Sequence, residues 1–299
     1  MDLLSIAALG IIAGSTAYAF LRKAPLSLAY AIAAIVIFVL EVATVPFGLG
    51  LSFLGASRAL GDLGLAYGPG IFPDPWTWAS FQFVHGGIDH LFLNLLAFLF
   101  IAPVLEERIG PVRWALLFFL GGAAGALLFV LLEPGPALLV GASAGLLALF
   151  AAYGRLYPRE RVHLFLPLPG MPGLPVLTVV IGFLVLQLLL SLRGPSGVAW
   201  SAHVGGMLFG FATAPVLMRL PLPGGRSRKR VEPGSLRGLA TTPELRTILE
   251  EIERADVAEV REAWVARFLE RAVCPTCGGP LRLRGRTLAS GCGWKARLG

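Results

Sequence analysis

Seven long apolar segments constrain this chain more than any other feature of its sequence. They cover residues 3–21, 26–46, 81–104, 111–132, 138–154, 174–192 and 198–218. A helix of roughly 20 apolar residues crosses the hydrocarbon core of a bilayer and satisfies its own backbone hydrogen bonds there. The sequence therefore predicts an all-α polytopic membrane protein with seven transmembrane helices.

The composition supports a membrane protein. The chain is 56% hydrophobic and 14% charged, and its mean hydropathy is +0.76, whereas soluble domains average roughly 25% charged residues. The first segment follows Asp2 and has no basic flank before it, so we expect a span rather than a cleavable signal peptide. The net charge of +7 lies largely in short loops and in the polar tail, which indicates contact with a lipid bilayer and no nucleic-acid partner.

The distribution of basic residues predicts the orientation in the membrane. One set of loops and the tail contains Arg22, Lys23, Arg108, Arg113, Arg155, Arg159, Arg161, Arg219 and the run 226–230. The opposite set contains only Arg58 and Arg193. Because loops rich in Lys and Arg stay in the cytoplasm, we expect a cytoplasmic tail and an N-terminus outside, in a bacterial or archaeal cell membrane.

Polar side chains gather at the outer ends of three predicted spans. His85, His90 and Asn94 lie near the start of the third span, Ser143 opens the fifth and His203 lies near the start of the seventh. Polar groups at membrane depth cost several kcal/mol unless they find partners. All three spans enter from the same side, so the topology brings these residues to a similar depth and predicts a functional site.

The residue types in this cluster suggest nucleophilic catalysis. A serine hydroxyl becomes a good nucleophile only when a base removes its proton, and His203 is the candidate base for Ser143. The oxyanion that forms needs positioned donors, for which the Ser143 N–H, the His90 imidazole and the Asn94 amide are candidates. No acidic residue is well placed to orient His203, so we expect a two-residue dyad without a cofactor.

Two other interpretations of the histidines stay open. His85, His90 and His203 together suit a metal ion, and intramembrane histidines also serve as proton relays in transporters. The chain has no His-Glu-x-x-His spacing typical of zinc proteases. It also lacks the internal repeat that many transporters show.

Small residues spaced four apart predict close helix packing in the fifth and seventh spans. The spacings are Gly141-x3-Gly145 and Ala202-x3-Gly206-x3-Gly210. Small side chains allow helix backbones to approach closely in lipid. Such packing would bring Ser143 and His203 within hydrogen-bonding reach.

Together these motifs resemble the rhomboid family of intramembrane serine proteases. They are His85-x4-His90-x3-Asn94, Gly141-x-Ser143, Ala202-His203-x2-Gly206-x3-Gly210 and Glu106-Glu107-Arg108-Ile109-Gly110. The resemblance covers about residues 26–218 as a bacterial-type six-helix core, to which residues 1–21 add a span. It implies a dyad of Ser143 and His203, an oxyanion site with His90 and Asn94, and His85 as a nearby polar support. It also implies single-span membrane proteins as substrates, cut in or near the span.

The chain departs from the family pattern at three positions. Thr77 follows Trp76 where members commonly have arginine, and Ala144 follows the serine where many have glycine. Leu147 stands where many bacterial members have a tyrosine that stacks on the catalytic histidine. These changes bear on the rigidity of the first loop and on the orientation of His203. The alternative function is therefore a catalytically inactive rhomboid-like protein that binds membrane helices.

The sequence divides into an extra helix (1–25), a protease-like core (26–220), a basic linker (221–240) and a cytoplasmic appendage (241–299). A helix start at Thr242 predicts one amphipathic helix to about Ala272, which would dock on a cytoplasmic partner or on a second copy.

Three cysteines follow that helix: Cys274, Cys277 and Cys292. They resemble a zinc ribbon whose fourth ligand position is Ala289. Since structural zinc normally has four protein ligands, we expect either a structural zinc site or a knuckle that has lost its metal.

Overall fold

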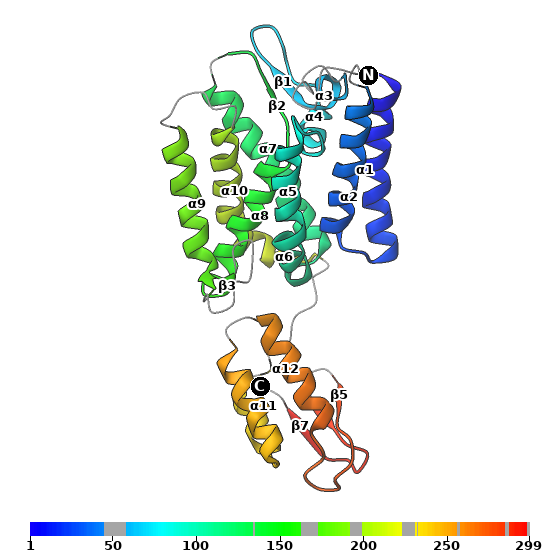
Figure 1. The fold of residues 1–299 in the computed structure, drawn as a ribbon, viewed down its shortest axis with the longest axis vertical. Coiled ribbons are helices and arrows are strands. Elements are labelled where there is room, and N and C mark those ends of the chain that lie inside the picture. Colours follow the sequence, from blue (N-terminus) through cyan, green and yellow to red (C-terminus); the bar gives the residue numbers. More distant parts are fainter. Residues whose placement is uncertain are drawn as a thin grey trace. The chain divides into compact units, whose positions relative to one another are not determined.

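The computed structural model describes residues 1–44, 58–133, 135–162, 173–191, 199–222, 231, 233–255, 258–284 and 287–297. The chain forms two compact units. The first combines Met1–Arg159 with Val176–Ser227, and the second combines Glu160–Pro175 with Arg228–Gly299. Figure 1 shows the helices of the first unit and the smaller helix-and-sheet unit.

The first unit is a bundle of apolar helices. They are α1 (Leu3–Arg22), α2 (Leu26–Thr44), α5 (Ile88–Phe100), α6 (Ala102–Ile109), α7 (Pro111–Leu132), α8 (Ser143–Leu156), α9 (Val176–Ser191) and α10 (Trp200–Arg219). Among the described residues, five helical stretches are long and apolar enough to span a bilayer, with α5 and α6 counted as one, while α8 and α9 are shorter. The chain is thus an all-α polytopic membrane protein, and every predicted apolar segment contains one of these helices.

Two helices begin later than the sequence predicts. The third predicted span started at residue 81, but residues Phe81–Phe83 form the 3₁₀ turn η2 and α5 begins at Ile88. The fifth was predicted from residue 138, but Ala137–Leu139 form strand β2 and α8 begins at Ser143. Gly141 explains the second delay, because its φ of +105° is not helical and its N–H donates to the Phe81 carbonyl oxygen at 2.8 Å.

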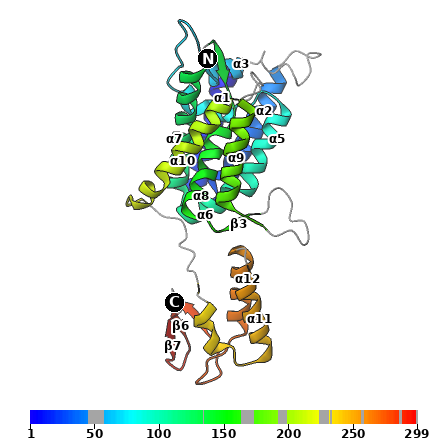
Figure 2. The same ribbon diagram turned by 90° about the vertical axis from the view of Figure 1, so that its left-hand side faces the viewer.

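Helices α7, α8 and α10 form the centre of the bundle, and both views show α9 beside α8 and α10 (Figures 1 and 2). Gly206 and Gly210 of α10 lie directly on the backbone of α8. A Cβ at Gly206 would collide with the Ala144 carbonyl oxygen, and one at Gly210 with the Ala148 carbonyl oxygen. The predicted close packing of small residues is confirmed for α10 and for Gly145, but Gly141 precedes α8 and does not take part in it.

Two buried charged side chains bind the ends of neighbouring helices. Glu106 of α6 accepts hydrogen bonds from the backbone N–H groups of Leu26 (2.6 Å) and Ser27 (2.9 Å), which begin α2. It thereby satisfies donors that a helix start leaves without intrahelical partners. Arg113 of α7 donates to the Leu217 carbonyl oxygen near the end of α10 at 3.1 Å. The bonds of Glu106 give the acidic-basic motif after the third span a structural role.

The segment before α5 is tied to the segment before α8. Strand β1 (Leu65–Tyr67) pairs antiparallel with β2, after the short helix α3 (Arg58–Leu63). The next short helix, α4 (Thr77–Ser80), is held by hydrogen bonds from the Thr77 hydroxyl to the Asp74 carbonyl oxygen (2.6 Å) and from the Ser80 hydroxyl to the Leu63 carbonyl oxygen (2.8 Å). Thr77 thus closes the turn at the start of α4, and Ser80 ties the end of α4 to Leu63.

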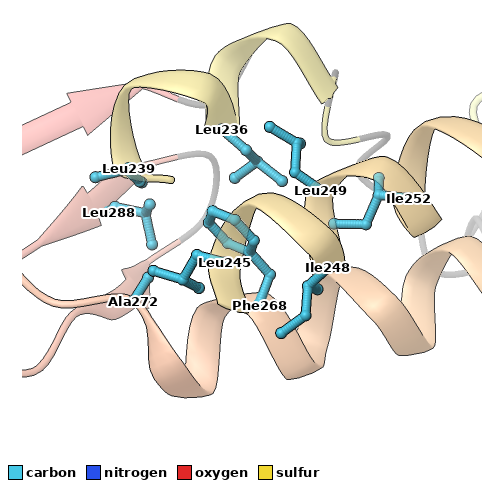
Figure 3. Packing of buried hydrophobic residues seen from close by; sticks show 9 residues of the cluster. All are labelled: Leu236, Leu239, Leu245, Ile248, Leu249, Ile252, Phe268, Ala272 and Leu288. Carbon is cyan, nitrogen blue, oxygen red and sulfur yellow. The ribbon is translucent and has the colours of Figure 1, made fainter. Parts of the chain in front are cut away.

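The second unit has its own hydrophobic core. It contains η3 (Pro233–Leu239), α11 (Pro243–Arg254), α12 (Ala258–Arg271), and the antiparallel strands β5 (Arg282–Arg284), β6 (Thr287–Ala289) and β7 (Lys295–Arg297). It also includes the paired strands β3 (Arg161–Val162) and β4 (Leu174–Pro175). Figure 3 shows the core residues, which are Leu236, Leu239, Leu245, Ile248, Leu249, Ile252, Phe268, Ala272 and Leu288.

The prediction of a single amphipathic helix in this unit is wrong. Helix α11 ends at Arg254, Ala255 is non-helical, and α12 packs back against α11. The sequence pattern places Ile248, Ile252, Val260 and Phe268 on the apolar side of that single helix. In the structure Ile248, Ile252 and Phe268 are buried inside the unit, whereas Val260 is exposed. The unit therefore uses most of this side for its own core, and docking on a cytoplasmic partner or on a second copy stays a prediction.

The contact between α8 and α10 gives a stability prediction. Gly206→Ala would force the backbones apart and should lower the free energy of unfolding by about 1–3 kcal/mol. Gly182→Ala in α9 is a matched control, because a Cβ there meets nothing within 4 Å and alanine favours a helix. Thermal unfolding in detergent measures both; equal stability of the two variants would contradict the role of this contact.

Candidate active site

Ser143 and His203 lie within hydrogen-bonding distance. The Ser143 Oγ is 2.7 Å from the His203 Nε2, within the range in which a base can take a proton. Ser143 is the first residue of α8 and His203 lies in the first turn of α10. The two side chains meet because Gly206, one turn after His203, seats α10 on the backbone of α8.

The start of α8 provides an anion-binding environment beside Ser143. The first N–H groups of a helix have no intrahelical acceptor and form its positive end. Gly141 and Ala142 turn the chain so that α8 begins directly at Ser143. The Ser143 backbone N–H is therefore the first N–H of this helix, and its role as an oxyanion donor stays a prediction.

His90 and His85 lie close to one another next to this turn. The His90 ring packs against Gly141, where a Cβ would collide with the ring. The His85 and His90 ring centroids are 5.2 Å apart, edge to face. His85 is fully buried and precedes α5, so it lies in the part of the predicted third span that is not helical. The structure thus brings His90 to the segment that carries the serine.

Asn94 is buried one turn after His90 and bonds first to its own helix. Its Nδ2 donates to the His90 carbonyl oxygen at 2.9 Å. An amide nitrogen carries two hydrogens, and this bond uses one of them. Asn94 also fixes the helix turn that presents His90.

Gln187 of α9 was missed by the sequence analysis. Its Oε1 lies 3.1 Å from the His203 Nδ1, on the side of the ring opposite Ser143. The search for a group that orients His203 considered acidic residues only. The sequence did contain a signal for Gln187: it is a long polar side chain in a segment that is otherwise nearly uniformly apolar.

The described residues do not support a metal site made of histidines. In that part of the chain, one group of His, Cys, Asp or Glu side chains has the geometry of a metal site: Cys274, Cys277 and Cys292, whose sulfur atoms lie within 4.8 Å of one another. The Cys274 and Cys292 sulfurs are 3.6 Å apart, and the Cys277 Sγ is 3.3 Å from the Ser290 Oγ. This group fits a metal ion.

The electrostatics favour the thiolate form at two of the three cysteines. Burial opposes ionisation of Cys274, but hydrogen bonds from the backbone N–H groups of Thr276 and Cys277 lower the pKa of its thiol to about 6. The Ser290 hydroxyl is the main cause that lowers the pKa of the Cys277 thiol. Although a hydrogen bond from the Trp294 backbone N–H opposes the rise, contacts with Cys277 and Cys274 raise the pKa of the third thiol, Cys292. Thiolates are the form of cysteine that binds metal ions.

Comparison with known proteins agrees with the geometry. The Rhomboid domain family model matches residues 73–220. Rhomboid-like protease 3 of Toxoplasma gondii is 40% identical over 96 residues, which are 32% of this chain and 36% of that protein. The putative rhomboid protease YdcA of Bacillus subtilis is 26% identical over 152 residues, or 50% of this chain and 68% of that protein.

One similar protein is named as inactive. Inactive RHOMBOID-like protein 8 of Arabidopsis thaliana is 38% identical over 56 residues, which are 19% of this chain and 16% of that protein. The chain spans little more than a third of the Toxoplasma relative and less of the plant one. Activity therefore has to be argued from the site of this chain itself.

The turn before α8 gives a prediction about serine reactivity. Gly141→Ala would strain the positive φ and push against the His90 ring, so labelling of Ser143 by a fluorophosphonate should slow by roughly tenfold or more. Gly135→Ala is the control, since a Cβ there meets nothing within 4 Å. Labelling is followed by mass spectrometry in detergent. Equal labelling rates for the two variants would show that this turn does not shape the site.

Proposed function

The chain belongs to the rhomboid family, and we propose that it is an intramembrane serine endopeptidase that cuts single-span membrane proteins in or near their transmembrane segment. The observation that carries this proposal is the 2.7 Å approach of the Ser143 Oγ to the His203 Nε2. The positive end of α8 and the adjacent His90 support it, because the reaction needs both a nucleophile and oxyanion donors.

The mechanism follows from these positions. His203 Nε2 takes the proton of the Ser143 hydroxyl while Oγ attacks the scissile carbonyl carbon. The Ser143 N–H and the side chains of His90 and Asn94 stabilise the resulting oxyanion. The His203 imidazolium then gives its proton to the leaving amine nitrogen, which leaves an acyl group on Ser143. Water, activated by the same histidine, hydrolyses the acyl-enzyme and restores the hydroxyl.

The length of α8 supports cleavage below the membrane surface. This helix has 14 residues and at 1.5 Å per residue is about 21 Å long, short of a hydrocarbon core of roughly 30 Å. If the last turn of α8 reaches one boundary of the hydrocarbon core, Ser143 at the other end of the helix lies within the core, below the opposite boundary. A substrate helix hides its carbonyl groups in i→i−4 hydrogen bonds, so we expect substrates with helix-breaking residues near the cut.

Basic residues support an active site that faces outside. Arg22, Arg108, Arg155 and Arg219 lie in the last turns of α1, α6, α8 and α10. Cations are favourable at helix C-termini and mark the cytoplasmic side. Ser143 lies at the opposite end of α8, so we propose that the site opens outward and the tail is cytoplasmic.

Cleavage of a single-span reporter by purified protein in liposomes tests the dyad. Ser143→Ala and His203→Ala should each lower the rate by roughly 10³-fold or more, because neither residue works without the other. Thr213→Ala on α10 should cleave normally, since this hydroxyl bonds back to the Phe209 carbonyl oxygen of its own helix. Equal cleavage by Ser143→Ala would refute the assignment, and a folded parent that cuts no reporter would favour the inactive helix-binding alternative.

We also propose that Cys274, Cys277 and Cys292 hold a structural zinc ion, with the Ser290 hydroxyl on the fourth side. Tetrahedral zinc with bonds of about 2.3 Å places its sulfur ligands about 3.8 Å apart, close to the 3.6 Å between Cys274 and Cys292. Ser290 also interacts with the thiols of Cys274 and Cys292. It follows Ala289, the position of the missing fourth cysteine.

Metal content tests this site. The full chain should contain zinc, and Cys277→Ser should lose it and lower the unfolding temperature of the second unit. Ser290→Ala should weaken Co²⁺ binding by roughly tenfold or more and change the visible Co²⁺ spectrum. Ala289→Cys should restore tight binding to Ser290→Ala by supplying a fourth thiolate. Absence of metal from the folded parent would contradict the site, whereas an unchanged spectrum in Ser290→Ala would exclude only the serine.

A further inference from the structure

We propose that Gln187 is a positioning residue that holds His203 in the one tautomer able to accept the proton of Ser143. The inference rests on the proposed serine-protease function and adds a third residue to its dyad. It arises from the contact of Gln187 Oε1 with His203 Nδ1 at 3.1 Å, on the far side of the ring from Ser143.

The chemistry of the two ring nitrogens fixes the tautomer. A neutral imidazole has one N–H donor and one lone-pair acceptor. The Gln187 Oε1 is an amide oxygen and only accepts, so its contact places the hydrogen on the His203 Nδ1. The lone pair then lies on Nε2, 2.7 Å from the Ser143 Oγ. With the other tautomer, Nε2 would carry a hydrogen and could not act as the base.

The position of Gln187 in α9 indicates a specific role for its amide. Its side chain is 7% exposed, while the neighbouring Leu186 and Leu188 are each 46% exposed. α9 thus turns its long polar residue inward and its leucines outward. A buried amide without a partner costs several kcal/mol in apolar surroundings. The contact with His203 removes that cost and orders the ring at the same time.

Gln187 also explains how His203 can be oriented although Leu147 replaces the tyrosine of the family pattern. In the family pattern that this chain resembles, a tyrosine at this position of α8 stacks on the histidine. Leu147 has no polar atom, so it can restrict the plane of a ring by packing but cannot select a tautomer. A hydrogen bond at Nδ1 restricts both the plane and the tautomer. In this chain α9 therefore supplies the orienting contact at the His203 Nδ1, while Ser143 of α8 contacts the Nε2.

An amide is a suitable partner at this depth. A carboxylate stabilises an imidazolium more strongly, but it brings a second charge that has to be buried in a membrane protein. Loss of a charged partner in serine proteases costs about 10⁴ in kcat through the wrong tautomer. A neutral hydrogen bond is weaker, so we expect a smaller effect.

Three variants of α9 separate positioning from packing. Gln187→Met keeps the length of the side chain but removes the acceptor, and should lower kcat for a single-span reporter roughly tenfold or more with KM unchanged. Gln187→Glu keeps an oxygen acceptor at the same place and should retain most of the activity. Leu186→Met is the matched control on the exposed side of α9 and should behave as the parent. Thermal unfolding of each variant verifies that the bundle is folded.

The outcomes distinguish this inference from the function on which it rests. The inference falls if Gln187→Met keeps its kcat, if only KM changes, or if Gln187→Glu loses as much kcat as Gln187→Met. The inference stands if Gln187→Glu is active and Gln187→Met is impaired in kcat alone. A parent that does not cleave, or a Ser143→Ala variant that cleaves equally well, refutes the protease function itself and the positioning role with it.

Discussion

The direct contact between the backbones of α8 and α10 is the constraint on which the rest of the structure depends. Glycines of α10 lie on carbonyl oxygens of α8, so the two helices approach more closely than any side chain would allow. In lipid there is little hydrophobic driving force between helices, and close van der Waals packing takes its place. This approach sets the distance between Ser143 and His203, so the packing of α8 and α10 determines the geometry of the site.

Buried polar groups in the bundle are placed where they fasten the chain to itself. Glu106 binds the start of α2, and Arg113 binds the end of α10. The hydroxyl groups of Thr77 and Ser80 form hydrogen bonds within the loop that precedes α5. Each bond joins segments that are distant in sequence or closes a turn. Near Ser143, the side chains of His203 and Gln187 likewise join α8, α10 and α9.

Much of the fold and of the site was predictable from the sequence. The apolar segments locate every long helix, and their order places Ser143, His90 and His203 together, because a bilayer admits few arrangements of such segments. Helix starts were less predictable. Gly141 and the turn at Phe81–Phe83 delay α8 and α5, and apolar composition alone does not distinguish a turn buried in the bundle from a helix. The tail was misjudged because an amphipathic pattern does not reveal that a chain folds back on itself.

The sequence by itself determined that this is a polytopic membrane protein of the rhomboid family with a serine and two histidines at one end of its bundle. Membrane insertion requires apolar segments of a given length, and the motif spacings are local, so both can be read along the chain. Only the tertiary structure decided which side chain orients His203. Gln187 has no spacing that links it to the histidine, and the two meet because the rotation of α9 in the bundle turns this amide inward. A hydrogen bond between side chains of different helices depends on how those helices pack, which no local pattern specifies.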